Sequence, residues 1–230
     1  MRPKLLTFDI FGTVIDWRCG LRESLRRHGA ALDDSEFDRV IDYQAEIETG
    51  RYRSYTSIVA SSLVHVLGIP PAAARSIGAE AGTWSLYPDA RTALARLMRI
   101  APCVASTNSD QAHGRQTQQQ LGFDLTDWIC AEETRSYKPD PAVWAHVASR
   151  RGARFGRHWY HVSAYADYDL ETARRLGLTS VFVSRPHARV GPADFYVRDL
   201  QELARRLTPG ARGWSPGSSG GPPRRGGRAG

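Results

Sequence analysis

Polar side chains at four places along the chain have the types that covalent hydrolysis requires. The stretch 8–14, FDIFGTV, ends an apolar run with a carboxylate and follows it with a Gly-Thr turn. The other candidates follow along the chain: Thr107, Asn108, Lys138, Asp167 and Asp169. A carboxylate can attack an electrophile while a cation keeps it ionised, and a second carboxylate can position or activate water. These residues therefore suit a hydrolase with a covalent intermediate, provided that the fold brings them together.

Short apolar runs and helical patterns alternate along the second part of the chain. We expect strands at 4–8, 102–105, 128–130, 160–162 and 180–183, and helices at 90–99, 110–121, 141–150, 170–176 and 199–207. Such alternation predicts an α/β fold in which helices cover both faces of a parallel sheet. Ligands bind such sheets at the carboxyl ends of the strands. The candidate residues follow strands or lie in loops before helices, so we expect them at this edge.

The segment 16–87 has helical patterns and no predicted strand. We expect a helix around Leu21 and Leu25, a second at 36–48 capped by Ser35, a third at 55–67, and a fourth that begins at Pro70-Pro71. The predicted organisation is a Rossmann-like catalytic core at 1–15 and 88–207 with a helical cap inserted at 16–87. The remaining segment, 208–230, is a basic stretch rich in Gly, Pro and Arg that we expect to be disordered.

Composition narrows the classes of function. The formal net charge is +7, but the arginines beyond residue 209 contribute +4 of it, and no nucleic-acid motif is present. No apolar run approaches the ~20 residues that span a bilayer. The 3 cysteines are widely spaced and read as reduced thiols in a cytoplasmic protein. We expect a small-molecule substrate as partner, neither nucleic acid nor membrane, and leave a homodimer open.

The motifs FDxxGT, STN and KPDP, followed by an acidic loop, resemble the haloacid dehalogenase (HAD) superfamily of hydrolases in their order and spacing. The resemblance implies that Asp9 is the nucleophile and that Lys138 neutralises it. It also implies that Thr13, Thr107 and Asn108 bind the reacting group, and that Asp169 belongs to the last acidic motif and helps the water. The predicted core and helical insertion also resemble this superfamily, and the resemblance implies a HAD-like core with a cap domain.

Phe11 separates two branches of this superfamily. Phosphatases of the superfamily carry a second Asp at this place, which protonates the leaving alkoxide, and a Gly-Asp pair that ligates magnesium where this chain has Ser163-Ala164. Phe11 cannot transfer a proton, so we place it among the substrate-binding residues. The stretches FDIFGTVIDWR and YKPDPAVW resemble the 2-haloacid dehalogenases. That resemblance implies displacement of halide from C2 of a small 2-haloalkanoic acid, through an aspartyl ester and without a cofactor.

Several residues depart from the dehalogenase pattern. The haloacid dehalogenases bind the leaving halide with a cap arginine, and by approximate position this chain has Tyr43 there instead. We take Tyr43 as a candidate substrate-binding residue; Arg51 and Arg53 lie nearby in the sequence. Trp144 replaces a tyrosine, and the last motif has Ala164 and Ala166 in place of Ser and Asn. Ring opening of a strained amine, a magnesium-dependent phosphatase with a degenerate motif, and a catalytically silent binding protein therefore stay open. Asp169, Thr107 and Asn108 could also simply begin helices.

Overall fold

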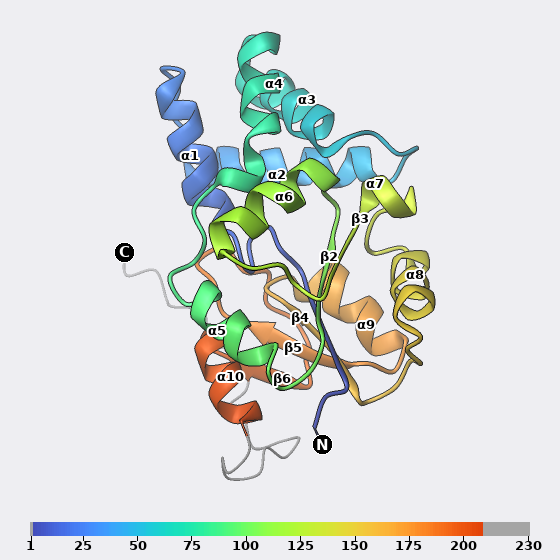
Figure 1. The fold of residues 1–230 in the computed structure, drawn as a ribbon. Coiled ribbons are helices and arrows are strands. Elements are labelled where there is room, and N and C mark those ends of the chain that lie inside the picture. The colour runs from blue at the N-terminus through green and yellow to red at the C-terminus, as the bar shows by residue number, and fades with distance from the viewer. Residues whose placement is uncertain (1, 209–230) are drawn as a thin grey trace, which may run out of the picture.

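A six-stranded parallel sheet forms the centre of the structure, a computed structural model that describes residues 2–208 (Figure 1). Its order is β3-β2-β1-β4-β5-β6. The strands are β1 (Leu5–Phe8), β2 (Cys103–Thr107), β3 (Asp127–Cys130), β4 (Trp159–Ser163), β5 (Thr179–Val183) and β6 (Phe195–Val197). The expected disordered segment 208–230 lies outside the described residues except for Thr208. Because β1 sits between β2 and β4, its carboxyl end meets residues from both neighbours.

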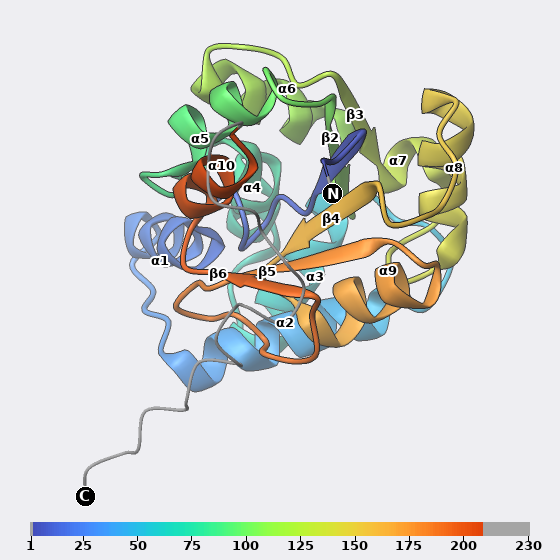
Figure 2. The same ribbon diagram turned by 90° about the horizontal axis from the view of Figure 1, so that it is seen from below.

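Helices cover both faces of the sheet, which confirms the predicted α/β class (Figure 2). Apolar residues of α5 (Ala90–Leu97), α6 (Gln111–Leu121) and α10 (Leu200–Leu207) belong to the large core cluster on one face. On the other face, α8 (Pro141–Arg151) and α9 (Glu171–Arg175) pack against Leu5, Val104 and Trp159. The strands are mostly apolar because both of their faces are buried.

A block of helices follows β1 and lies over the carboxyl edge of the sheet (Figure 1). It consists of α1 (Trp17–Arg27), α2 (Asp34–Glu48), α3 (Tyr55–Leu67), α4 (Pro71–Ala79) and the 3₁₀ turn η1 (Ala81–Thr83). The chain enters and leaves the block side by side, since Ile15 and Leu86 form an isolated antiparallel bridge. This joint lies next to the expected limits of the cap, and we propose that the block is a cap domain of its own.

Local details differ from the sequence expectations in four places. The helix α2 is capped by Asp33 instead of Ser35: Asp33 Oδ1 accepts from the Glu36 N–H at 2.7 Å, and Glu36 Oε2 accepts from the Asp33 N–H at 2.9 Å. The expected helix 170–176 is present as the shorter α9, and an unexpected π-helical turn, η2 (Ala166–Leu170), precedes it. The strand β6 and the helix α7 (Ala131–Thr134) were not expected, because elements this short carry no periodic signal.

Within residues 2–208, no helix combines the length and the apolar character that crossing a bilayer requires.

Candidate active site

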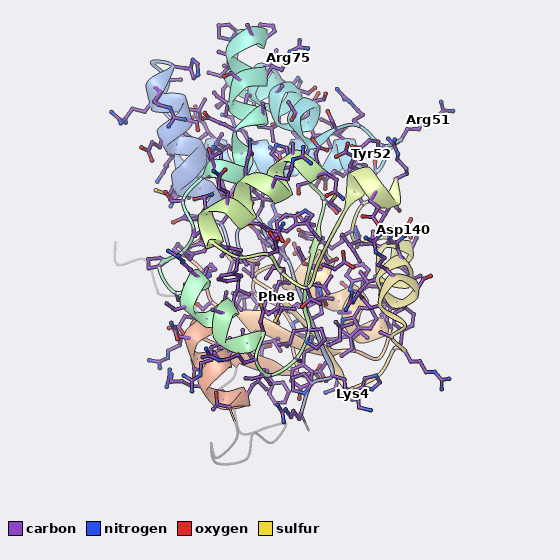
Figure 3. The ribbon with its side chains drawn as sticks, viewed as in Figure 1. Lys4, Phe8, Arg51, Tyr52, Arg75 and Asp140 are labelled. Carbon is purple, nitrogen blue, oxygen red and sulfur yellow. The ribbon has the colours of Figure 1, made fainter. Side chains whose placement is uncertain are left out.

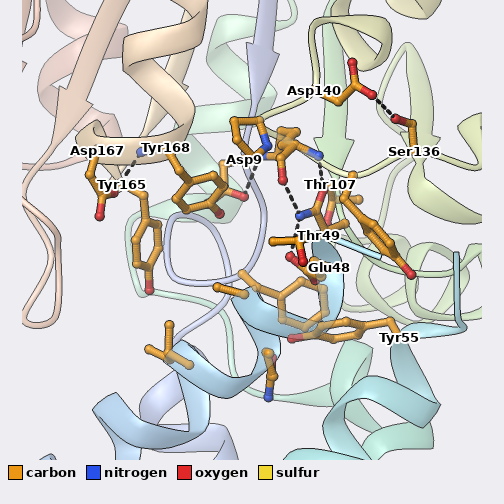
Figure 4. A pocket seen from close by; sticks show the side chains of 18 of the residues that line it. Asp9, Glu48, Thr49, Tyr55, Thr107, Ser136, Asp140, Tyr165, Asp167 and Tyr168 are labelled. Atoms are coloured by element: carbon orange, nitrogen blue, oxygen red, sulfur yellow. Dashed lines mark hydrogen bonds and ion pairs between the residues drawn. The ribbon is translucent and has the colours of Figure 1, made fainter. Parts of the chain in front are cut away.

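A cavity of about 570 Å³ separates the carboxyl edge of the sheet from the helical block. The core contributes Asp9, Asn108 and Lys138 to its wall, and the cap helices contribute Gln44, Glu48 and Tyr55. Figure 4 shows the side chains that enter the cavity from the two sides. The position agrees with the rule that open parallel sheets bind ligands beyond the carboxyl ends of their strands.

Asp9, Lys138 and Asp169 form one buried ionic cluster. Lys138 Nζ donates to Asp9 Oδ1 at 3.0 Å and to Asp169 Oδ2 at 2.8 Å. All three side chains are buried, with 3%, 2% and 0% of the residue exposed, respectively. Thus the structure brings together the predicted nucleophile, its predicted cation and the predicted acidic motif, although they lie far apart in the sequence.

Charge within this cluster depends on the lysine. Burial raises the pKa of Asp9; Lys138 lowers it in part, and the negative charge of Asp169 raises it further. Burial alone would lower the pKa of Lys138, but Asp169 and Asp9 outweigh this and hold it above its ordinary value. The pKa of Asp169 lies well below its ordinary value although burial opposes the shift, because Lys138 and His161 stabilise its charge. One ammonium therefore opposes the desolvation of two buried carboxylates.

Thr13 holds the other oxygen of Asp9. Its hydroxyl donates to Asp9 Oδ2 at 2.7 Å and accepts from the backbone N–H of Ala164 at 3.0 Å. The turn after β1 brings Thr13 back beneath the carboxylate, and Gly12 permits that turn with a φ of 90°. Thr13 and Lys138, which donate to the two oxygens of Asp9, are thus in place before any substrate binds. The structure supports a role for Thr13 in orienting the nucleophile, whereas the resemblance implied contact with the reacting group.

Asp169 lies behind Lys138 and does not line the cavity. Its Oδ1 pairs with His161 Nε2 at 2.8 Å, and its Oδ2 accepts from Lys138. Since both oxygens are bonded and neither faces the cavity, the geometry favours a positioning role through Lys138 over the expected role of helping the water.

A chain of buried hydrogen bonds, not expected from the sequence, supports Asp169. Trp159 Nε1 donates to Thr7 Oγ1 at 2.9 Å, and Thr7 Oγ1 lies 2.7 Å from His161 Nδ1. Thr7 and His161 are register partners on adjacent strands. The available signal was a polar residue inside each of two apolar strands. Because buried polar groups require partners, such a pair points to a network.

We expect Thr7→Val to lower the free energy of unfolding by roughly 2–4 kcal/mol, since it leaves the Trp159 indole N–H and His161 Nδ1 without partners in the core. Urea denaturation measures this loss. Thr117→Val is the matched control, because the Thr117 hydroxyl donates to the backbone carbonyls of His113 and Gly82 and accepts no hydrogen bond from residues 2–208. Equal losses in the two variants would show that the Thr7 network adds no special stability.

The side-chain amide of Asn108 is already occupied. Its Oδ1 accepts from the Lys138 N–H at 2.7 Å, and its Nδ2 donates to the Lys138 carbonyl at 3.0 Å and to Glu48 Oε2 at 2.7 Å. An amide has two donor hydrogens, so none is left for a substrate carboxylate. Thr107 lines the cavity, with its hydroxyl 3.3 Å from Ser109 Oγ. Asn108 therefore fixes the backbone of the lysine loop and reaches the cap.

Phe11 lies in the cavity wall, and Tyr43 does not. The Phe11 ring packs against Tyr55 with centroids 5.0 Å apart. Tyr43 stacks on His65 at 4.2 Å, away from the cavity, because its position on α2 faces α3. The structure thus does not bring Tyr43 to the other site residues, and Arg51 projects outward from the surface (Figure 3).

Two cap residues that sequence reasoning missed also face the cavity. Glu48 closes α2, and Tyr55 opens α3. Glu48 lies at the end of an amphipathic helix, where an acidic residue normally indicates a solvated face. The sequence around it therefore gave no indication of a site residue. The Tyr55 hydroxyl is buried without a hydrogen-bond partner among residues 2–208.

The donor set does not fit a magnesium ion. No three His, Cys, Asp or Glu residues in the described part of the chain are grouped to bind a metal. Ala164 supplies no side-chain oxygen at the place where the metal-dependent pattern has a carboxylate. The oxygens of Asp9 and Asp169 are held by Lys138, Thr13 and His161.

The fold, the carboxylate after β1 and the lysine loop define a hydrolase with an inserted helical block. The family model for haloacid dehalogenase-like hydrolases matches residues 3–177, and the chain belongs to this family.

A curated relative and several solved structures resemble the chain. The (S)-2-haloacid dehalogenase 4A of Burkholderia cepacia is 27% identical over 126 residues, which are 52% of this chain and 54% of that protein. The match thus spans about half the length of the curated relative. A defluorinating L-2-haloacid dehalogenase superposes with a TM-score of 0.76 at 23% identity, covering 89% of this chain and 95% of that one.

Two further structures have the same fold. The L-2-haloacid dehalogenase of Xanthobacter autotrophicus gives a TM-score of 0.77 at 19% identity, covering 89% of this chain and 98% of that one. A HAD-hydrolase from Bacillus subtilis bound to magnesium gives 0.75 at 16% identity, covering 90% and 99%. Since the fold is shared by dehalogenases and by a magnesium-bound protein, the reaction must be argued from the site.

Proposed function

We propose that this chain is a metal-independent hydrolase that displaces halide from C2 of a small 2-haloalkanoic acid. The observation that carries the proposal is Asp9, a buried carboxylate in the wall of the cavity. Lys138 and Thr13 hold it, and the apolar ring of Phe11 lies in the same wall. The similarity to a curated (S)-2-haloacid dehalogenase supports the choice of substrate.

In the first step an Asp9 oxygen attacks C2 from the side opposite the halide. The carbon–oxygen bond forms as the carbon–halogen bond breaks, and the halide leaves with the electron pair. The ammonium of Lys138 favours the ionised form of the nucleophile and so opposes the burial that raises the pKa of Asp9. Because attack occurs at the opposite face, the configuration at C2 inverts.

In the second step water attacks the acyl carbon of the Asp9 ester, so Asp9 regains its carboxylate and the 2-hydroxy acid is released. Burial of Asp9 beneath the cap restricts bulk water around the ester. For the substrate carboxylate, the backbone N–H groups of Phe11 and Asn108 are the available donors, since neither has an acceptor among residues 2–208. Thr107 lies in the same wall.

Halide release from each enantiomer of 2-chloropropionate, measured in EDTA, tests the proposal. We expect release from one enantiomer, formation of lactate of the opposite configuration, and no stimulation by Mg²⁺. Absence of release from both enantiomers, together with Mg²⁺-dependent hydrolysis of a generic phosphate ester, would overturn it in favour of a phosphatase.

A further inference from the structure

The carboxyl group of Glu48 faces the cavity from the cap side, and that of Asp9 from the sheet side (Figure 4). Glu48 Oε2 accepts from Asn108 Nδ2 at 2.7 Å. Glu48 Oε1 has no hydrogen-bond partner in the described part of the chain. A substrate in the cavity would therefore lie between a nucleophilic carboxylate and a second carboxyl group with one oxygen unused.

Burial favours the protonated form of the Glu48 carboxyl group. Burial raises its pKa to about 8, although the hydrogen bond from Asn108 and the charge of Lys138 lower it, and the charge of Asp9 raises it further. Three tyrosines, Tyr55, Tyr137 and Tyr168, also interact with its charge. A neutral carboxyl that keeps one oxygen for Asn108 can present its O–H to a bound molecule.

The cations that line the cavity, Arg135, Lys138 and Arg189, come from the core and not from the cap helices. Arg135 lies over the Tyr52 ring at 4.6 Å, and Arg189 pairs with Asp42 and Asp167. Lys138 is shared by two carboxylates. The cap side thus offers a departing group a carboxyl O–H from Glu48 and the unpartnered O–H of Tyr55, instead of a free guanidinium. Proton donors of this kind suit a leaving atom that gains a proton.

We propose that Glu48 is a general acid that protonates an oxygen leaving group, so that the site opens small strained cyclic ethers that carry a carboxylate, of the oxirane-2-carboxylate class. The proposal rests on Asp9 as the nucleophile. It adds a proton donor, which displacement of a halide does not need. An alkoxide is a poor leaving group unless it gains a proton in the transition state.

Asp9 forms a bond to a ring carbon as the ring carbon–oxygen bond breaks, and the proton of Glu48 moves to the departing oxygen. The products are an aspartyl ester with a free hydroxyl and an ionised Glu48. Water then hydrolyses the ester at the Asp9 acyl carbon, and the proton released returns to Glu48. Overall, the cyclic ether and one water give a diol acid.

The test compares two leaving groups in one enzyme, with oxirane-2-carboxylate and 2-chloropropionate as substrates. Glu48→Gln preserves an oxygen for Asn108 and a donor for the substrate but cannot transfer a proton. We expect the ratio of kcat/KM for the oxirane to kcat/KM for the chloride to fall by roughly 100-fold or more in this variant. Glu46→Gln, an exposed change on the same helix, is the control and should leave the ratio unchanged.

The pH profile separates proton donation from positioning. With wild type, kcat/KM for the oxirane should fall as the pH rises through about 8, where Glu48 loses its proton. Besides burial, the neighbours that set this value are Asn108, Lys138 and Asp9. The other titratable groups that interact with Glu48 are Tyr55, Tyr137 and Tyr168, whose pKa values its charge raises. In Glu48→Gln this alkaline limb should be absent.

The outcomes distinguish this proposal from the proposed function. Release of chloride without opening of the oxirane would overturn the role of Glu48 and leave the dehalogenase proposal standing. Equal losses on both substrates in Glu48→Gln would also overturn it, since they indicate positioning. Opening of the oxirane without chloride release would support Glu48 and reject halide as the leaving group, whereas turnover of neither substrate would remove the proposed function itself.

Discussion

Asp9→Asn should reduce turnover of 2-chloropropionate by roughly 10³-fold or more, with the fold retained. The amide is a far weaker nucleophile than the carboxylate, so the covalent step is lost. The folded state should survive, because Lys138 remains paired with Asp169 at 2.8 Å and the Asn oxygen can accept from Thr13 or Lys138. Chloride release and the urea midpoint, measured side by side, check both statements.

An isotope experiment identifies the atom that attacks carbon. Wild-type enzyme in excess over substrate should complete a single turnover in H₂¹⁸O with unlabelled product, because the new hydroxyl oxygen comes from Asp9. The label should appear in the peptide that contains Asp9, as a mass increase that Asp9→Asn does not show. Label in the product of the first turnover would instead mean direct attack by water. Asp124→Asn, at an exposed position, controls for general effects of removing a carboxylate.

Most of the site residues at the carboxyl edge of the sheet could be predicted from the sequence, because their positions depend on where the strands end. Asp9 directly follows β1, Asn108 directly follows β2, and both strands were visible as apolar runs. In a parallel sheet these ends meet at one edge whatever the details of packing. The pairing of Lys138 with Asp9 followed from the resemblance and is what the geometry shows.

The cap contribution could not be predicted in this way. Which face of α2 meets the core depends on how the helical block packs over the sheet, and no local pattern encodes that arrangement. Tyr43 therefore falls against His65, while Glu48, five positions along the same helix, reaches Asn108. The buried network behind Asp169 was hidden for a related reason, since Thr7 and His161 become neighbours only through strand register.

Lys138→Met should cost the largest share of stability of any change discussed. It leaves Asp9 and Asp169 buried without the cation that they share. Breaking a buried ion pair from one side costs roughly 3–5 kcal/mol, because the remaining charge stays desolvated. Lys4→Met is a matched control, since Lys4 is exposed and is the only other lysine of the chain. Urea denaturation at pH 7 should show the loss in the first variant alone.

The dependence on pH gives this prediction its sign. In wild type the pKa of Asp169 is lowered by Lys138, so its contribution to stability is present above the ordinary carboxyl pKa and is lost as the pH falls. Without Lys138, burial and mutual repulsion should raise the folded-state pKa of both carboxyls. In Lys138→Met, the contribution of the two protonated carboxyls to the free energy of unfolding is then present at low pH and is lost as the pH rises. The deficit of Lys138→Met relative to wild type should therefore grow between about pH 4 and 7.

Adding Asp169→Asn to Lys138→Met should return part of the lost stability, because one of the two uncompensated charges is removed. It should not return activity, since Asp9 still lacks the ammonium that lowers its pKa. Recovery of stability without recovery of turnover would show that Lys138 has two separable roles, one in neutralising the core and one in keeping the nucleophile ionised. A deficit independent of pH in the single variant would contradict the ionic explanation and attribute the loss to packing.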